Sequence, residues 1–262
     1  MSRVITLLTD FGTVDGYVGE MKGILLSSGA DIEIVDITHD VPPQDVERAR
    51  LTLARVWRRF PAGTIHIVVV DPGVGSARRG LAIASDEHFL IGPDNGVLSP
   101  ALVVHGARVI ELPVPPSASF TFHGRDVFAP AAAAIALGES IDEFGRVVDD
   151  PIIHRTPEPR RIADGAIEGQ VIVVDRFGNG ITNLITLKGG MVTVNGRAIP
   201  VRHTYAEVAP GQPVAVVGST GFIEVAVRDG SAAESLGIVR GTKVILTTDN
   251  HPTSTDRHGD SG

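Results

Sequence analysis

Short apolar runs alternate with longer amphipathic stretches over the first half of the chain, and this pattern predicts strands and helices. Runs rich in Val and Ile occur at 4–8, 32–38 and 64–71 and predict three strands. The segments 15–29 and 42–60 place apolar residues at helical spacing and predict two helices. Such alternation is typical of a mostly parallel sheet with helices on both faces.

Three further segments complete this expected domain. The runs 80–85 and 88–94 predict two more strands, and the alanine-rich segment 127–138 predicts a helix that can pack closely on the sheet. We therefore expect residues 1–150 to form an α/β sheet domain. Ligands of such sheets bind beyond the carboxyl ends of the parallel strands.

The pattern changes after residue 150. Segment 151–166 is rich in proline and charge and has no clear period, which predicts a linker. Residues 167–249 contain short apolar runs separated by Gly, Asn-Gly and Pro-Gly turns, which predict an antiparallel β-barrel domain. The polar tail, residues 250–262, is expected to be disordered.

Composition narrows the function classes. The 262 residues carry a net charge of -8, which argues against a nucleic-acid partner and is compatible with a cationic small ligand. The chain has no cysteine, which excludes disulfides, a thiolate zinc site and a cysteine nucleophile. The first apolar stretch is cut by Asp10, is too short to span a membrane and lacks a signal-peptide layout, so we expect a cytoplasmic protein without membrane contact.

Two carboxylates follow apolar strands directly. Asp10 ends the run in "LLTDFG", and Asp71 ends the run in "VVVDPG". A single Asp at such a position commonly caps a turn or the next helix. Two such carboxylates at the same edge of one sheet support a ligand site and a structural role about equally.

The turn after Asp71, "GVGSARRG", lacks the Gly-Lys-Ser/Thr ending of a phosphate loop and the Gly-x-Gly-x-x-Gly spacing of a dinucleotide site. Arg78 or Arg79 can instead fold back over Asp71. A surface ion pair of this kind contributes only about 0–1 kcal/mol. A less solvated pair at a strand mouth would keep Asp71 ionised.

His123 in "FTFHGRD" precedes the alanine-rich helix and fits a capping, core or site residue. Metal binding is not expected, because neither a His-x-x-x-His pair nor a cluster of carboxylates and histidines occurs. In the second domain, "VDRFGNGITN" holds Asp175, Phe177 and Asn179. These residues fit either an ordinary hairpin turn or a polar ligand site with an aromatic stacking surface. Ser219 lies in a glycine-flanked turn with the same two interpretations.

Five segments occur in a specific order: "TDFGTVDGYVGEMKG", "VVVDPGVGSARR", "IGPDNGVL", "FHGRDVFAP" and "VDRFGNGITN". Together they resemble the S-adenosyl-L-methionine (SAM) hydrolases, or hydroxide adenosyltransferases, which are relatives of fluorinase and chlorinase. The resemblance extends over nearly the whole chain up to the polar tail. It implies a sheet domain followed by a β-barrel, in a homotrimer with active sites between the N-terminal domain of one subunit and the C-terminal domain of a neighbour. It also implies that SAM and water give adenosine and L-methionine, without a cofactor or a metal.

The same resemblance implies roles for individual residues. Asp71, Arg78 and His123 fall on the family's water-handling positions, Asp10 on its ribose-binding carboxylate, and Asp15 on the second acidic position of that loop.

In the second domain, Phe177 falls on the aromatic residue that packs on adenine, and Asp175 and Asn179 on polar positions near the methionine end. Ser219 matches a methionine-end position of the halogenases, where Thr220 replaces their arginine.

Two alternatives stay open beside hydrolysis. The halogenases have a tyrosine in place of Asp71 and a Tyr-Ser pair in place of His123 and Gly124. A carboxylate repels a halide but orients water, so these differences favour hydrolysis. A non-catalytic protein that binds adenosine or SAM would have no use for the water-handling residues. Either Asp71 or His123 could accept the proton from water.

Overall fold

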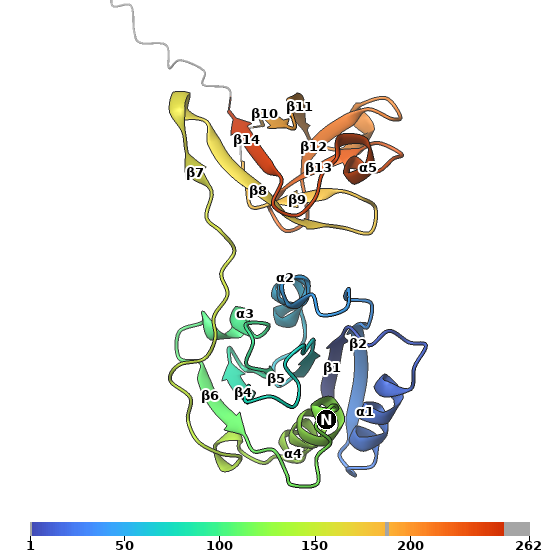
Figure 1. The fold of residues 1–262 in the computed structure, drawn as a ribbon, viewed down its shortest axis with the longest axis vertical. Coiled ribbons are helices and arrows are strands. Elements are labelled where there is room, and N and C mark those ends of the chain that lie inside the picture. Colours follow the sequence, from blue (N-terminus) through green and yellow to red (C-terminus); the bar gives the residue numbers. More distant parts are fainter. Residues whose placement is uncertain (1, 187–188, 249–262) are drawn as a thin grey trace, which may run out of the picture. The chain divides into compact units, whose positions relative to one another are not determined.

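The computed structural model describes residues 2–186 and 189–248, which divide into two compact units, Met1–Arg155 and Thr156–Gly262. Each unit has its own sheet and its own core (Figure 1). The boundary between the units falls inside the expected linker, 151–166. The tail expected to be disordered, 250–262, lies outside the described residues. Within the described part, no helix is long and apolar enough to cross a membrane.

The N-terminal unit contains a six-stranded sheet in the order β2-β1-β3-β5-β4-β6. The strands are β1 (Arg3–Thr9), β2 (Ile32–Thr38), β3 (Ile65–Val69), β4 (Gly80–Ser85), β5 (His88–Pro93) and β6 (Arg108–Leu112). Strands β2, β1, β3 and β5 run parallel, whereas β4 is antiparallel to β5 and to β6. The predicted sheet domain is confirmed, with β6 as a strand that the apolar pattern did not reveal.

Helices cover both faces of this sheet. They are α1 (Tyr17–Leu26), α2 (Val46–Val56), α3 (Ser99–Leu102) and α4 (Ala129–Leu137). Figure 1 shows α1 and α4 side by side on one face and α2 on the other. A π-helix, Gly124–Phe128, leads into α4, and short 3-10 helices occur at Trp57–Arg59, Ile141–Glu143, Ala163–Gly165 and Tyr205–Glu207. Helix α2 begins later than the predicted start at residue 42, because Gln44 has a positive φ of 65° and Asp45 caps the helix.

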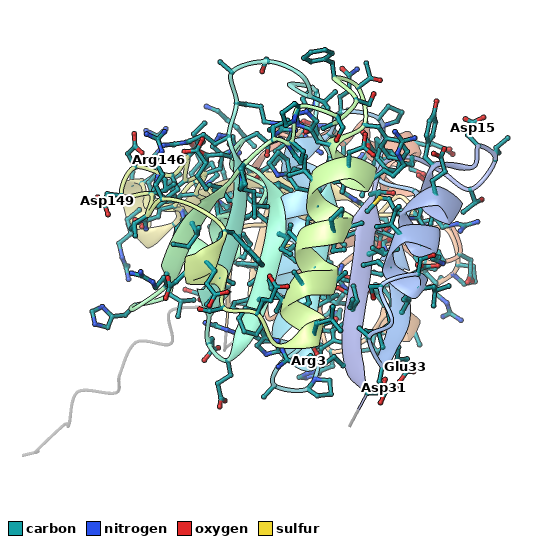
Figure 2. The ribbon with its side chains drawn as sticks, turned by 90° about the horizontal axis from the view of Figure 1, so that it is seen from below. Arg3, Asp15, Asp31, Glu33, Arg146 and Asp149 are labelled. Atoms are coloured by element: carbon teal, nitrogen blue, oxygen red, sulfur yellow. The ribbon has the colours of Figure 1, made fainter. Side chains whose placement is uncertain are left out.

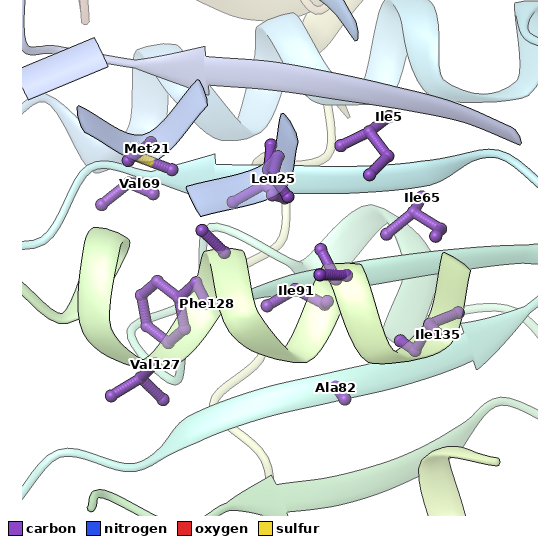
Figure 3. Close-up of a cluster of buried hydrophobic side chains, with 14 of the residues drawn as sticks. Ile5, Met21, Leu25, Ile65, Val69, Ala82, Ile91, Val127, Phe128 and Ile135 are labelled. Carbon is purple, nitrogen blue, oxygen red and sulfur yellow. The ribbon is translucent and has the colours of Figure 1, made fainter. Parts of the chain in front are cut away.

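The central strands contribute side chains to two separate apolar cores. Ile65 and Val69 pack beneath α1 and α4 with Met21 and Phe128, as Figure 3 shows, whereas Val68 belongs to the core on the opposite face. Successive side chains of a strand point to opposite faces, so a strand buried on both faces needs an unbroken apolar run. The polar residues inside these strands, Thr6 and His66, are buried and bind each other, with Thr6 Oγ1 2.7 Å from His66 Nδ1.

The C-terminal unit is a closed barrel of seven strands, β8 to β14, because β14 pairs with β8. Its strands are β8 (Ile167–Val174), β9 (Gly180–Thr182), β10 (Met191–Val194), β11 (Arg197–Arg202), β12 (Pro213–Val217), β13 (Ile223–Val227) and β14 (Lys243–Thr247); β7 (Arg160–Arg161) adds to β8, and α5 (Ala232–Leu236) follows β13. The predicted barrel is confirmed. One pair, β11 with β12, is parallel rather than antiparallel.

Candidate active site

The two carboxylates that follow β1 and β3 lie at the same cleft of the N-terminal unit. Thr9 and Val69 are paired across the two strands, so the chain leaves the sheet at neighbouring points. Asp10 and Asp71 both line a cleft of about 390 Å³. Asp10 Oδ2 accepts a hydrogen bond from the backbone N–H of Gln44 at 2.7 Å, which fixes one face of this carboxylate.

Asp71 and Arg78 form a two-point ion pair at this cleft. Arg78 Nε donates to Asp71 Oδ1 at 3.0 Å, and Arg78 Nη2 donates to Asp71 Oδ2. The two side chains are only 5% and 9% exposed, so this is not the weak surface pair of the first interpretation. The guanidinium also lies over the ring of Phe128, 5.4 Å from its centroid. The geometry therefore holds Asp71 in one orientation, in a poorly solvated setting.

His123 joins the same network. Its Nδ1 lies 2.9 Å from Arg78 Nη2. A guanidinium can only donate, so Nδ1 must accept and the neutral ring carries its proton on Nε2. Burial lowers the pKa of His123, and the positive charge of Arg78 lowers it further, against the opposing effects of Asp71 and Asp126. His123 is therefore neutral at pH 7.

The remaining guanidinium nitrogen, Arg78 Nη1, is buried and has no hydrogen-bond partner among the described residues. Asp71 and His123 line the cleft, whereas Arg78 is not among the lining residues. The arrangement thus presents a carboxylate and an imidazole to the cleft and supports both through one arginine. The structure brings the three predicted residues together.

Three aromatic side chains form an apolar wall of the same cleft. Phe11, Tyr17 and Phe122 line it and pack against one another with ring centroids 5.3 to 5.7 Å apart. The sequence did not predict them as a group, because Tyr17 belongs to the helical pattern of α1, whereas Phe11 and Phe122 lie in loops, which have no periodic pattern. The only available signal was adjacency, since Phe11 follows Asp10 and Phe122 precedes His123.

The C-terminal unit has a larger cleft of about 730 Å³, lined by Asp175, Phe177 and Asn179 among others. Asp175 Oδ1 accepts from the backbone N–H groups of Phe177 and Asn179, both at 2.9 Å, and so shapes the turn between β8 and β9. Only glycine fits at Gly178, because its φ is +82° and a Cβ would lie 2.2 Å from Ser231 Oγ. This turn leaves Phe177 75% exposed. Asp175, Phe177 and Asn179 therefore form an ordinary hairpin turn, and the same residues also line a cleft.

Tyr205 is a lining residue of this cleft that sequence analysis missed. Its hydroxyl donates to Glu224 Oε2 at 2.8 Å. Burial raises the pKa of Tyr205 to about 12, and the bond to Glu224 adds to the effect. The hydroxyl thus stays protonated at neutral pH. No motif surrounds Tyr205 that could have marked it in advance.

Two predicted residues lie outside both clefts. Asp15 is exposed in the loop before α1, and Figure 2 shows it at the outer edge of the molecule, pointing away from the sheet. Ser219 is exposed in the turn between β12 and β13 and does not line the C-terminal cleft. Over residues 2–186 and 189–248, no group of three or more His, Asp and Glu side chains is placed to hold a metal ion.

Comparison with known proteins identifies the family. Sequence profiles of the SAM hydroxide adenosyltransferase N-terminal and C-terminal domains match residues 5–145 and 169–245. An (R)-S-adenosyl-L-methionine hydrolase of Thermus thermophilus is 43% identical over 257 residues, covering 93% of this chain and 99% of that protein. A fluorinase of an Actinoplanes species is 27% identical over 292 residues, covering 93% and 97% of the two chains.

A solved structure agrees with this result. The crystal structure of an uncharacterized conserved protein from Thermotoga maritima matches with a TM-score of 0.84 at 31% identity, covering 92% of this chain and 99% of that one. The chain therefore belongs to the SAM hydroxide adenosyltransferase family.

Proposed function

We propose that this protein hydrolyses SAM to adenosine and L-methionine. The observation that carries the proposal is the Asp71–Arg78–His123 network at the N-terminal cleft, because it places an acceptor and a donor where one water molecule can be oriented. Membership in the family and the hydrolase name of the Thermus relative support the same reaction. That name specifies the R epimer, and we propose the same preference here.

The proposed reaction is a displacement at the ribose 5′ carbon. The oxygen of water forms a bond to this carbon while the bond from carbon to sulfur breaks, and its electron pair stays on sulfur. Methionine leaves as a neutral thioether, so the leaving group needs no general acid. The remaining task is to orient water in line with sulfur and to remove one proton, which together provide much of the rate enhancement.

Asp71 is the better candidate for the proton acceptor. His123 Nδ1 already accepts from Arg78 and its Nε2 already carries a proton, so the neutral ring is a donor toward water. Each Asp71 oxygen accepts from Arg78 and still has a lone pair for water. Arg78 acts by holding both groups. The proposed reaction uses neither a cofactor nor a metal.

Substrate binding is divided between the two clefts in this proposal. Asp10 has a second carboxylate oxygen for the ribose hydroxyls, and the exposed ring of Phe177 provides a face for adenine. Asp175 and Asn179 would contact the methionine end. Asp15 and Ser219 stay proposed substrate contacts on the family resemblance alone, because both are exposed and neither lines either of these two clefts.

We also propose that the protein is a homotrimer in which the N-terminal unit of one subunit and the C-terminal unit of a neighbour bind the same substrate molecule. The assignment of water-handling and adenine-binding residues to different units supports this arrangement. A cytoplasmic location belongs to the same proposal, because SAM is made inside cells. Sedimentation analysis should give the mass of three chains, and the mass of a single chain would contradict the proposal.

One experiment separates hydrolysis from its alternatives. Purified protein is mixed with each sulfonium epimer of SAM in ¹⁸O-labelled water, with and without chloride, and the products are analysed by chromatography and mass spectrometry. We expect adenosine with ¹⁸O at the 5′ position, and chloride should make no difference. A 5′-chloro nucleoside would indicate a halogenase instead, and unchanged SAM would indicate a binding protein.

A further inference from the structure

Two consecutive residues of the motif "IGPDNG" contact both flanks of the Asp71–Arg78 pair. Asn95 Nδ2 donates to the carbonyl oxygen of Val70 at 2.9 Å, and Val70 is the residue before Asp71. Asp94 Oδ2 accepts from Arg79 Nε at 2.8 Å and lies 2.6 Å from Arg79 Nη2. Arg79 is the residue after Arg78, so both ends of the loop 70–79 are held by neighbouring side chains.

These contacts are made in the interior. The Asp94 side chain is only 2% exposed, and its second oxygen accepts from the backbone N–H of Ile152 at 2.8 Å. The Asp94 N–H also donates to the carbonyl of Arg79 at 2.9 Å, which extends the β4–β5 pairing by one step. Charged hydrogen bonds of this kind are strong, and removing one partner leaves a buried charge unpaired. Asp94 is thus fully engaged, unlike a surface carboxylate.

Inside the loop, the Asp71–Arg78 pair links the two ends, and the N–H of Val74 donates to the carbonyl of Asp71 at 3.2 Å. The tip of the loop, residues 75–77, is exposed, and Ser76 bonds to Gly73 and to the N–H of Arg78. The contacts at Val70 and Arg79 therefore fix the backbone next to Asp71 and next to Arg78.

We propose that Asp94 and Asn95 are positioning residues that hold Asp71 and Arg78 within reach of His123. This inference rests on the proposed hydrolysis, since it assigns what keeps the water-handling groups in place. The adjacent arginines then have separate tasks: Arg78 organises the reacting groups, and Arg79 ties the loop to Asp94. A misplacement of about 1 Å at a reacting centre costs on the order of 10²-fold in rate.

Two nearly isosteric variants test the proposal independently. Asp94→Asn removes the buried one of the two carboxylates that pair with Arg79, and the exposed Asp150 remains. Asn95→Asp keeps the acceptor for the N–H of Val97 but removes the donor to Val70. In each we expect kcat to fall about 10- to 100-fold, while the dissociation constant for adenosine changes by less than about threefold. The matched control is Asp142→Asn, which breaks the exposed ion pair with Arg108 in the same unit and should leave kcat unchanged.

Three measurements decide the outcome: kcat and KM for SAM, the thermal midpoint, and the ¹⁵Nε resonance of Arg78 assigned with Arg78→Lys. A shifted Arg78 resonance with a reduced kcat supports positioning. Wild-type kcat in both variants, even with a lowered thermal midpoint, would make the contacts purely structural and overturn the inference. If the wild-type protein releases no adenosine, hydrolysis itself fails, and an Arg78 resonance unchanged by Asp94→Asn then overturns positioning separately.

Discussion

The two clefts differ in how their polar groups are engaged. At the N-terminal cleft, Asp71 and His123 each bond to Arg78, and the side chains of Asp71 and Arg78 are almost completely buried. In the C-terminal cleft, Asp175 is occupied with its own turn, and Phe177 stands three-quarters exposed. Charges that act on a reacting centre work best when they are fixed and shielded from water. An aromatic surface that stacks on adenine, by contrast, has to be accessible to solvent before the substrate binds.

This difference divides catalysis from affinity. Substitutions in the N-terminal network should change kcat, because in the proposed mechanism these side chains contact the attacking water and not the rest of the substrate. Changes on the open face of the barrel unit should act on substrate affinity.

The largest effect is expected from Asp71→Asn. This variant keeps the shape of the side chain but replaces a proton acceptor with an amide, so kcat should fall about 10²- to 10⁴-fold. The dissociation constant for SAM should change by less than about threefold, because Asp10 and the barrel residues remain. Single-turnover adenosine release and calorimetric titration measure the two quantities.

Asp142→Asn serves as the control for this variant, since its side chain is 49% exposed in an ion pair outside the cleft. Adenosine release at the wild-type rate from Asp71→Asn would remove Asp71 from the mechanism. A loss of affinity equal to the loss of rate would abolish the contrast between the clefts.

The sequence predicted these two regions unequally well. Asp10 and Asp71 could be placed together because apolar runs end at both residues and parallel strands end at one edge. The spacing alone left the choice between Arg78 and Arg79 open, because adjacent residues differ only in direction, and the family resemblance assigned Arg78. In the structure Arg78 bonds to Asp71 and Arg79 bonds to Asp94.

Other features depend on contacts between distant segments. The lowered pKa of His123 follows from burial and from the charge of Arg78, 45 residues away in sequence, and no local pattern encodes either. The parallel pairing of β11 with β12 also escaped prediction, because turn residues mark a connection but not the direction of the next strand. Tyr205 was missed for a similar reason, since it lies in the connection between β11 and β12 and lines the cleft together with the distant turn that holds Asp175 and Phe177.

A second prediction compares the stability of the two units in acid. The N-terminal unit buries His66 and His88 with their ring nitrogens 3.4 Å apart, and Thr6 Oγ1 lies 2.7 Å from His66 Nδ1. Burial, and after it the charge of His88, lower the pKa of His66 to about 3. In the described part of the barrel unit, His203 is the one histidine, and it is exposed.

The unfolded chain binds a proton at His66 below its ordinary pKa of 6.5, whereas the folded chain does so only near 3. The free energy of unfolding of the N-terminal unit should therefore fall as the pH drops below about 6.5, by about 2 kcal/mol at pH 5. Urea titrations followed by fluorescence of Trp57, the single tryptophan, report this unit.

His66→Asn removes this contribution, so about 2 kcal/mol of the loss at pH 5 should disappear in that variant. The loss that remains is assigned to His88 and His123, whose pKa values burial also lowers. Amide hydrogen exchange in β12 and β13 follows the barrel over the same pH range and should show less change. Equal acid sensitivity of wild type and His66→Asn would mean that other groups cause the loss.

The smallest effect is expected from Phe177→Ala. Stacking of a base on an aromatic ring contributes about 1–3 kcal/mol, so losing this open surface should raise the dissociation constant for SAM about tenfold. The rate at saturating SAM should stay within about twofold of wild type, because Phe177 lies in a different unit from Asp71 and His123. Calorimetric titration and saturation kinetics measure the two quantities.

Phe177→Tyr keeps an aromatic face and provides the matched control, which should bind SAM as the wild type does. If Phe177→Ala lowered the saturated rate while leaving affinity unchanged, the barrel turn would take part in the chemical step. The contrast between a fixed catalytic cleft and an open binding face would then be wrong, since a residue 75% exposed in the single chain would have to be ordered at the reacting centre.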